Sequence, residues 1–155
     1  MSTNSVHYYS SPIGDLRIEF DGPAIVALQF SNEGLPSGTK LTGEPKEAFD
    51  DYFLHRKNLS LSFEVNGTDF QKKVWQEVSK IPFGSTCSYL ELAERCGGKT
   101  YTRAVASANG ANPLLLIVPC HRVIGSNNSL TGYAGGLERK RWLLDWEKGQ
   151  GSLFE

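Results

Sequence analysis

Alternating apolar and polar positions near the start of the chain predict short strands. Leu16, Ile18 and Phe20 alternate with polar side chains, which is typical of a strand that buries one face. The same pattern, interrupted by turn residues, predicts strands over 6–10, 15–20 and 24–30 with a tight turn over 21–23. We expect these strands to form one small sheet.

The pattern changes after the third strand. Residues 31–45 are rich in Gly, Ser, Thr and Pro and have no apolar period, which indicates an irregular surface connection. A helix is predicted over 44–57, with Phe49 and Phe53 one turn apart. Renewed alternation predicts a further strand over 59–65. Residues 1–66 are therefore expected to form a small mixed or antiparallel sheet with a helix laid on it, in a structural role.

The second half of the chain is predicted to be mainly helical. Apolar side chains at nearly every fourth position predict a helix over 70–81, which Thr68 or Asp69 can cap and Pro82 ends. A second long helix is predicted over 137–148.

Two short helices between these long ones form a candidate helix-turn-helix. Ser88 and Glu91 have the spacing of a capping box and open a helix that runs to Cys96. After a glycine pair, the second helix begins at Thr100 or Thr102 and runs to about residue 108. Two short helices joined by a glycine turn are a common DNA-binding unit, but many such pairs bind nothing.

Arg103 is the one long cation on a second helix made of small side chains. Small side chains would allow the helix backbone to approach a groove closely while Arg103 projects into it. Alternatively, the alanines pack against a neighbouring helix and Arg103 is solvated. The pattern alone leaves both interpretations open.

Composition and charge narrow the class of protein. The 155 residues are 39% hydrophobic and 21% charged, which suffices for a packed interior. A formal charge of −1 excludes a polybasic nucleic-acid binder. Residues 1–65 carry 5 basic and 9 acidic side chains, net −4, whereas residues 66–155 carry 11 and 8, net +3. A polyanionic partner is therefore expected to meet the second half.

The cysteines, histidines and apolar runs indicate which cellular compartment and which kinds of site to expect. Cys87, Cys96 and Cys120 are odd in number and show no paired framework, so reduced thiols in a cytosol are expected. His7 and His55 lie far apart, without the spacing of metal ligands. The N-terminus lacks the features of a signal peptide, and the longest apolar run is far below the ~20 residues of a membrane span. We expect no membrane association.

A cysteine beside a histidine is the strongest chemical signal. The sequence Pro119-Cys120-His121-Arg122-Val123 follows an apolar run, 114–118, that is predicted to be a buried strand. Adjacent side chains in extended backbone point to opposite faces, so Cys120 and His121 need a turn or a bridging water to communicate. A buried cysteine is also often an inert small apolar group.

Glu147 is unusual at the end of the last helix. A carboxylate at the negative end of a helix dipole is disfavoured by ~0.3–1 kcal/mol. A buried partner such as His121 could hold it there, or it could be a frayed, solvated side chain beside Lys148. The sequence favours neither.

Taken together, these residues closely resemble the O6-alkylguanine-DNA alkyltransferase family, also called methylated-DNA–protein-cysteine methyltransferases. The resemblance is strong over about 70–148 and rests on residues 119–123, Asn112-Pro113, Arg103, Ser88-Tyr89, residues 133–137 and Glu147. It implies an α+β fold. Residues 1–66 would form a ribonuclease H-like structural domain, and residues 67–155 a helical, winged-helix-like domain that carries the helix-turn-helix and the active-site cysteine.

The resemblance implies DNA repair. The protein would flip O6-alkylguanine, with O4-alkylthymine as a further candidate, out of duplex DNA and transfer the alkyl group irreversibly to Cys120. His121 would be the base, acting through water, and Glu147 would orient the imidazole. Asn112 would brace the turn beside the active site, and Tyr89 would donate a proton toward guanine N3.

The resemblance also implies a set of DNA contacts in the minor groove. Arg103 would fill the gap left by the flipped base, and backbone groups at Cys120, Val123 and Ala134 would read the guanine edge. The family often has Ser in place of Ala134, so a hydroxyl contact is missing here. The full set of expected substrate and DNA contacts is Arg103, Thr102, Ala104, Val123, Tyr133, Ala134 and Ser88.

The resemblance implies no cofactor, no metal and a monomer in the cytoplasm, associated with the nucleoid if bacterial. Three other classes stay open. Alkyltransferase-like proteins sense such lesions but lack the cysteine, which this chain has at Cys120. A Cys-His hydrolase would turn over, and a transcription factor would bind one DNA sequence.

Overall fold

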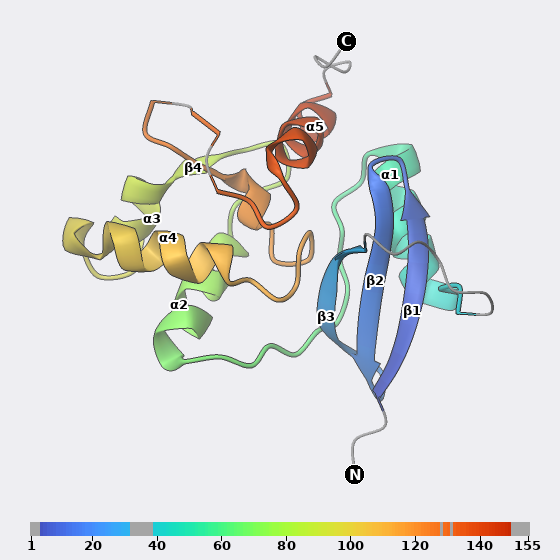
Figure 1. The fold of residues 1–155 in the computed structure, drawn as a ribbon. Helices are drawn as coiled ribbons and strands as arrows, with labels where there is room; N and C mark the ends of the chain where they lie inside the picture. Colours follow the sequence, from blue (N-terminus) through green and yellow to red (C-terminus); the bar gives the residue numbers. More distant parts are fainter. Residues whose placement is uncertain (1–3, 32–38, 128, 131, 150–155) are drawn as a thin grey trace. The chain divides into compact units, whose positions relative to one another are not determined.

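The computed structural model describes residues 4–31, 39–127, 129–130 and 132–149. The chain divides into two compact units, residues 1–66 and 67–155 (Figure 1). The mixed α+β class is confirmed, whereas the ribonuclease H-like and winged-helix labels stay predictions. None of the helices in the described part of the chain is long and apolar enough to cross a membrane.

The first unit is built on a three-stranded antiparallel sheet. Strands β1 (Asn4–Ser11), β2 (Gly14–Asp21) and β3 (Ala24–Ser31) lie in the order β1-β2-β3. The alternation that predicted β2 also decides its buried face, since Leu16 and Ile18 are fully buried. The three predicted strands are thus present, each slightly longer than expected.

Helix α1 (Gly43–His55) covers one face of this sheet (Figure 1). The aromatic ring of Tyr9 in β1 lies 5.3 Å from the ring of Phe49 and 5.9 Å from that of Phe53. These contacts explain why the two phenylalanines lie one turn apart. The described end of the connection before α1 pairs with β1, since the Tyr8 N–H donates to the Thr39 carbonyl and the Tyr8 carbonyl accepts from the Leu41 N–H, both at 2.8 Å. Residues 32–38 of that connection lie outside the described residues.

The strand predicted over 59–65 is absent. Phe63 forms only an isolated parallel bridge with Ile25 of β3. Of the alternating apolar side chains, Leu59 is buried but Phe63 is 38% exposed. The prediction was wrong because alternation specifies a strand only where one face is covered.

The second unit begins with α2 (Asp69–Val78), whose N-terminus is fixed by a capping box. The Thr68 hydroxyl accepts from Gln71 N–H at 3.1 Å, and the Gln71 side chain accepts from Thr68 N–H at 3.0 Å. The Trp75 indole N–H donates to the Ala108 carbonyl at 2.8 Å and so joins α2 to α4. The helix ends three residues earlier than predicted.

The predicted pair of short helices is present (Figure 1). Helix α3 (Tyr89–Arg95) carries the expected Ser88–Glu91 capping box, and α4 (Thr102–Gly110) follows a single 3-10 turn, η1 (Lys99–Tyr101). Gly97 and Gly98 between the helices have φ of 140° and 147°, a region that L side chains rarely adopt. The turn between α3 and α4 therefore depends on both glycines.

The apolar run 114–118 is a turn and not the predicted strand. Leu116 has φ of 72°, and the Val118 N–H donates to the Leu114 carbonyl at 2.9 Å. Every side chain of the run is buried. A short apolar run indicates that its side chains are buried, but it does not determine the backbone conformation. The predicted strand over 114–118 was wrong for this reason.

Three elements follow this turn: the 3-10 turn η2 (Cys120–Arg122), the short strand β5 (Val123–Ile124) and the helix α5 (Leu137–Glu147). Strand β5 pairs in parallel with β4 (Cys87–Ser88), directly before α3. This pairing, which no sequence pattern indicated, ties the turn that carries Cys120 to the start of the helix pair.

Candidate active site

Cys120 opens η2 and is 2% exposed. Its N–H donates to the Val118 carbonyl at 2.7 Å, and the Arg122 N–H donates to the Pro119 carbonyl at 2.9 Å. The backbone at Cys120 and His121 is therefore turned rather than extended. Consecutive side chains are not forced to opposite faces of the backbone, so the turn that the sequence required is present.

His121 and Glu147 form a buried pair. His121 Nε2 and Glu147 Oε2 lie 2.7 Å apart, and both side chains are almost completely buried. Burial raises the pKa of Glu147, but His121 and Arg122 outweigh this effect and lower it to about 2. Because the carboxylate is ionised, it accepts the hydrogen bond, and Nε2 donates it. Nδ1 is therefore the ring nitrogen left to exchange a proton, and Glu147 is buried rather than solvated.

Arg122 is a third member of this cluster, which the sequence reasoning did not identify. Its Nε and Nη2 donate to the two oxygens of Glu147 at 2.7 Å and 3.1 Å, and its Nη1 donates to the Ile81 carbonyl at 2.8 Å. The guanidinium also lies over the Phe83 ring at 5.7 Å. A two-point contact with a buried carboxylate fixes the orientation of Glu147 and therefore that of His121.

Lys140 is a second residue that the sequence did not reveal. Its Nζ donates to the Val123 carbonyl at 2.6 Å and lies 5.8 Å from the centre of the Tyr89 ring, and the residue is fully buried. Burial lowers the pKa of Lys140 to about 8, an effect that nearby Cys120 opposes. The only available signal was the seven-residue separation from Glu147, which places both on one face of α5.

The thiol of Cys120 is neutral in the resting protein. Burial raises its pKa to about 11, although Asn112 and Lys140 act in the opposite direction. A thiol is a weak nucleophile until it loses its proton. The arrangement therefore needs a base, and His121 is the adjacent one.

Two asparagines support the backbone around Cys120. Asn112 Nδ2 donates to the Val118 carbonyl at 2.8 Å, and Asn112 Oδ1 accepts from Leu114 N–H at 2.9 Å, so this side chain spans the turn before the cysteine. Asn109 Nδ2 donates to the Cys120 carbonyl at 3.3 Å. Asn112 was expected here, whereas Asn109, in the last turn of α4, was not.

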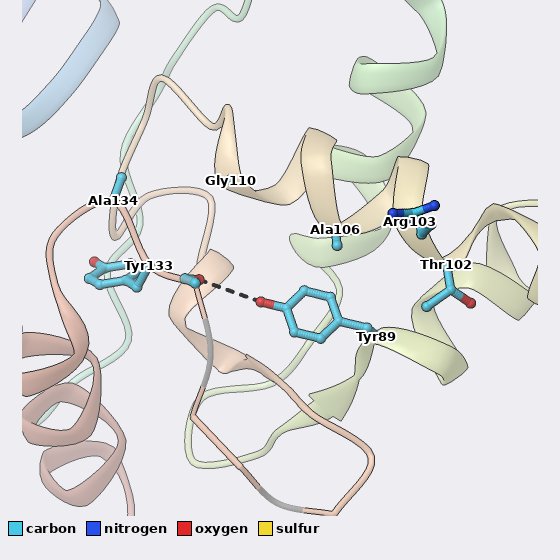
Figure 2. A pocket seen from close by; sticks show the side chains of 8 residues that line it. Tyr89, Thr102, Arg103, Ala106, Gly110, Tyr133 and Ala134 are labelled. Atoms are coloured by element: carbon cyan, nitrogen blue, oxygen red, sulfur yellow. Dashed lines mark hydrogen bonds between the residues drawn. The ribbon is translucent and has the colours of Figure 1, made fainter.

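A pocket of about 570 Å³ lies between α3, α4 and the segment before α5 (Figure 2). Its lining residues are Tyr89, Thr102, Arg103, Ala106, Gly110, Gly132, Tyr133 and Ala134. The Tyr89 hydroxyl donates to the Gly132 carbonyl at 3.5 Å across it. The volume lies in the range of pockets that bind small molecules.

The structure thus places most predicted site residues in two neighbouring groups. Cys120, His121, Glu147 and Asn112 form one group at and around η2, and Tyr133 links this group to the pocket because its ring lies 6.4 Å from that of His121. The remaining predicted contacts lie outside both groups: Ser88 caps α3, Ala104 is exposed on α4, and the Val123 carbonyl is bound by Lys140. Among the described residues, no cluster of His, Cys, Asp or Glu could hold a metal ion.

Comparisons with known proteins agree with this geometry. A family model described as 6-O-methylguanine DNA methyltransferase, DNA binding domain, matches residues 69–149. The methylated-DNA–protein-cysteine methyltransferase of Mycobacterium tuberculosis H37Rv is 40% identical over 153 residues, which cover 92% of this chain and 93% of that protein. A probable methylated-DNA–protein-cysteine methyltransferase of Acanthamoeba polyphaga mimivirus is 42% identical over 149 residues, covering 92% of this chain and 96% of that protein.

A solved structure matches both units. The crystal structure of Mycobacterium tuberculosis OGT in complex with DNA has a TM-score of 0.83 to this chain at 36% identity, and the match covers 96% of this chain and 95% of that one. The matches therefore extend well beyond the short signature around Cys120 and include the first unit. The chain belongs to the methylated-DNA–protein-cysteine methyltransferase family.

Proposed function

We propose that the protein repairs O6-alkylguanine in DNA by transferring the alkyl group to its own Cys120. The observation that carries this proposal is the combination of a buried neutral thiol with a histidine whose Nε2 is bound by an ionised carboxylate. Removing an alkyl group from an aryl ether needs a soft nucleophile, a base to generate it and an acid for the leaving group. This site offers all three, so the reaction needs no cofactor.

The chemistry follows from the roles of these side chains. The thiol proton of Cys120 passes through water to His121 Nδ1, and the resulting thiolate attacks the alkyl carbon. The new S–C bond forms as the C–O6 bond breaks, and the electron pair of the C–O6 bond stays on the guanine oxygen. Tyr89 donates a proton toward guanine N3 and makes guanine a better leaving group. A thioether has no acid–base route back to a thiol, so each molecule reacts once.

The lesion must leave the duplex before it can react, because O6 lies inside the base stack. Extruding a base costs a few kcal/mol, and an inserted side chain offsets part of that cost. Arg103 and Thr102 line the pocket from α4, and the small side chains of that helix suit close approach to a minor groove. We assign Arg103 to the vacated base position and the pocket to the extruded base.

The proposal includes a location and an assembly state. Cys87, Cys96 and Cys120 are all free thiols, which fits the reducing cytoplasm where chromosomal DNA is accessible in bacteria. One copy carries the thiol, the base and the DNA-contacting helix, so a monomer suffices.

The test is stoichiometric transfer from a defined lesion. The protein is incubated with a duplex that carries one O6-methylguanine, and intact and peptide masses are then measured. We expect a gain of one methyl group on the peptide that contains Cys120, and none in Cys120→Ser, which should still bind the duplex. A duplex with O4-methylthymine tests the wider substrate range.

Two outcomes would contradict the proposal. Methylation of Cys87 or Cys96 in the Cys120→Ser protein would place the chemistry elsewhere. Release of more than one equivalent of repaired DNA per protein would instead indicate a hydrolase that turns over.

A further inference from the structure

His121 Nδ1 and the Tyr133 phenol oxygen are buried polar atoms of the site without a hydrogen-bond partner among the described residues, and Asn109 Oδ1, beside the Cys120 backbone, is a third. Most buried polar atoms in folded proteins are hydrogen-bonded, to protein or to ordered water. When the imidazole carries a single proton, that proton is on Nε2, where ionised Glu147 accepts it, and Nδ1 is then an acceptor. The phenol is a donor. A single group that both donates and accepts hydrogen bonds could therefore satisfy both atoms at once.

Tyr133 is placed to reach both the pocket and the thiol cluster. The residue lines the pocket and is half-buried, but its hydroxyl oxygen is fully buried. The rings of Tyr133 and His121 meet nearly at right angles, 75°, with centres 6.4 Å apart. Figure 2 shows the Tyr133 ring directed away from Tyr89, so the two phenol hydroxyls lie in different parts of the site.

We propose that the Tyr133 hydroxyl and His121 Nδ1 bind one and the same water molecule and hold it against the Cys120 sulfur. Tyr133 is then a positioning residue for proton removal from the thiol, and not only the base contact that the sequence suggested. This inference rests on the proposed function, because it explains how the thiol is activated for transfer.

The hydrogen bonds balance in both protonation states. Before transfer, the water accepts from the Cys120 thiol and from Tyr133, and it donates to His121 Nδ1. The water then passes one proton to Nδ1 while it receives the thiol proton, so the sulfur becomes a thiolate and the ring an imidazolium. Afterwards the water donates to the sulfur and accepts from Nδ1–H and from Tyr133. The phenol donates throughout and does not itself change protonation.

The surroundings keep the phenol a donor. Burial, together with the neighbouring Cys120 and Glu147, raises the pKa of Tyr133 well above 10, while Arg139 acts in the opposite direction. Lys140 and Asn112 lower the pKa of the Cys120 thiol, and neither side chain is changed in Tyr133→Phe. A change in the thiol's titration on removing the phenol oxygen is therefore attributable to that oxygen.

The test measures the thiol directly, without alkylated DNA. The rate of Cys120 modification by iodoacetamide is followed against pH by peptide mass spectrometry, in the wild type and in Tyr133→Phe. We expect Tyr133→Phe to slow the modification about threefold to tenfold near neutral pH, the effect of one hydrogen bond, and to move its pH midpoint upward. Tyr101→Phe, which removes a phenol from exposed η1, is the matched control and should leave the profile unchanged.

An unchanged iodoacetamide profile in Tyr133→Phe would overturn the inference, and slower transfer from O6-methylguanine in the same variant would then make Tyr133 a substrate contact alone. Thermal unfolding of both variants shows whether the fold is kept. Failure of the proposed function looks different: the wild type would not accept a methyl group from DNA, while the dependence of its thiol on Tyr133 could still be present.

Discussion

At the scale of single residues, Glu147 binds two partners with one carboxylate. Oε2 contacts His121 at 2.7 Å, and both oxygens accept from Arg122. Because Arg122 already balances the carboxylate charge, His121 is oriented by Glu147 without facing an uncompensated anion. The pair can thus orient the ring while the imidazole stays free to accept a proton at Nδ1.

Lys140 gives a prediction about pH and stability. Its pKa falls from an ordinary 10.5 to about 8 in the folded protein, so between these values the unfolded chain binds more protons than the folded one. Lys140 should therefore contribute a free energy of unfolding that rises with pH in this window, by about 1 kcal/mol between pH 8 and 9. In Lys140→Met this rise should disappear. Denaturant unfolding at pH 7.5 to 9 measures it.

Lys148→Met is the control for this measurement, because Lys148 is exposed just beyond the same helix. Its pH profile should follow that of the wild type. A Lys140→Met profile that parallels the wild-type profile would mean that Lys140 does not contribute. The raised pKa values of the Cys87, Cys96 and Cys120 thiols make stability fall as the pH approaches and passes the ordinary thiol pKa in all three proteins, so the contribution of Lys140 is the difference between the wild-type and Lys140→Met profiles.

The sequence predicted Cys120, His121 and Glu147 as site residues, but not the side chains that hold them in place. Cys120, His121 and Glu147 were recognisable through the family signature. Lys140 was not, because a lysine in a charged helix is normally solvated, and only the fold shows that it is fully buried. Glu147 was ambiguous for the same reason, since burial depends on elements distant in sequence.

At the scale of elements, helices with local start signals were predictable and apolar runs were not. The capping boxes of α2 and α3 involve residues three apart, so the sequence contains the whole interaction. The segments 59–65 and 114–118 were read as strands, but their backbone depends on what covers them. The pairing of β4 with β5 joins residues 87 and 123, which no local pattern can show.

Arg103 on α4 gives a prediction about base extrusion. If it occupies the vacated base position, Arg103→Ala should sharply slow transfer from duplex O6-methylguanine but leave the reaction with free O6-methylguanine nearly unchanged, since the free base needs no flipping. Single-turnover rates with both substrates test this. Equal slowing on both would instead assign Arg103 to support of the thiol site.

Lys99→Ala is the comparison variant, because Lys99 is an exposed cation in η1, directly before α4. If Lys99 makes an ordinary phosphate contact, its removal in Lys99→Ala should weaken binding to all duplexes and reduce the salt slope of log K by about 0.9. A loss of this kind in Arg103→Ala, without a selective effect on duplex transfer, would make Arg103 a phosphate contact.

At the scale of the whole molecule, the two units differ in charge. The first carries net −4 and the second net +3, and the uncharged Asn66 at their boundary leaves these counts unchanged. A near-neutral total therefore coexists with one cationic unit. DNA binding by this protein is expected to depend on the second unit's own charges, because that unit carries the net positive charge that phosphates attract.

This asymmetry can be tested by neutralising charges on each unit. Glu44→Gln with Glu47→Gln changes two exposed acids of α1, and Lys72→Gln with Lys73→Gln changes two exposed bases of α2. Fluorescence anisotropy with an undamaged duplex, between 50 and 200 mM salt, gives each salt slope. We expect the slope to stay unchanged when the two acids of α1 are neutralised. Neutralising the two bases of α2 should either reduce the slope or leave it unchanged. A smaller slope in the α1 pair would contradict the assignment.

The burial of Cys120 also bears on how long each molecule stays usable. A protein that reacts once is a stored reagent, and any stray oxidant or electrophile that reaches its sulfur wastes the whole chain. With a pKa of about 11, the thiol is ionised to about one part in ten thousand at pH 7, against a few per cent for a free cysteine. Burial thus lowers the thiolate fraction of the resting protein by about two orders of magnitude. The same burial that makes a base necessary therefore protects the unreacted protein from stray oxidants and electrophiles in the cell.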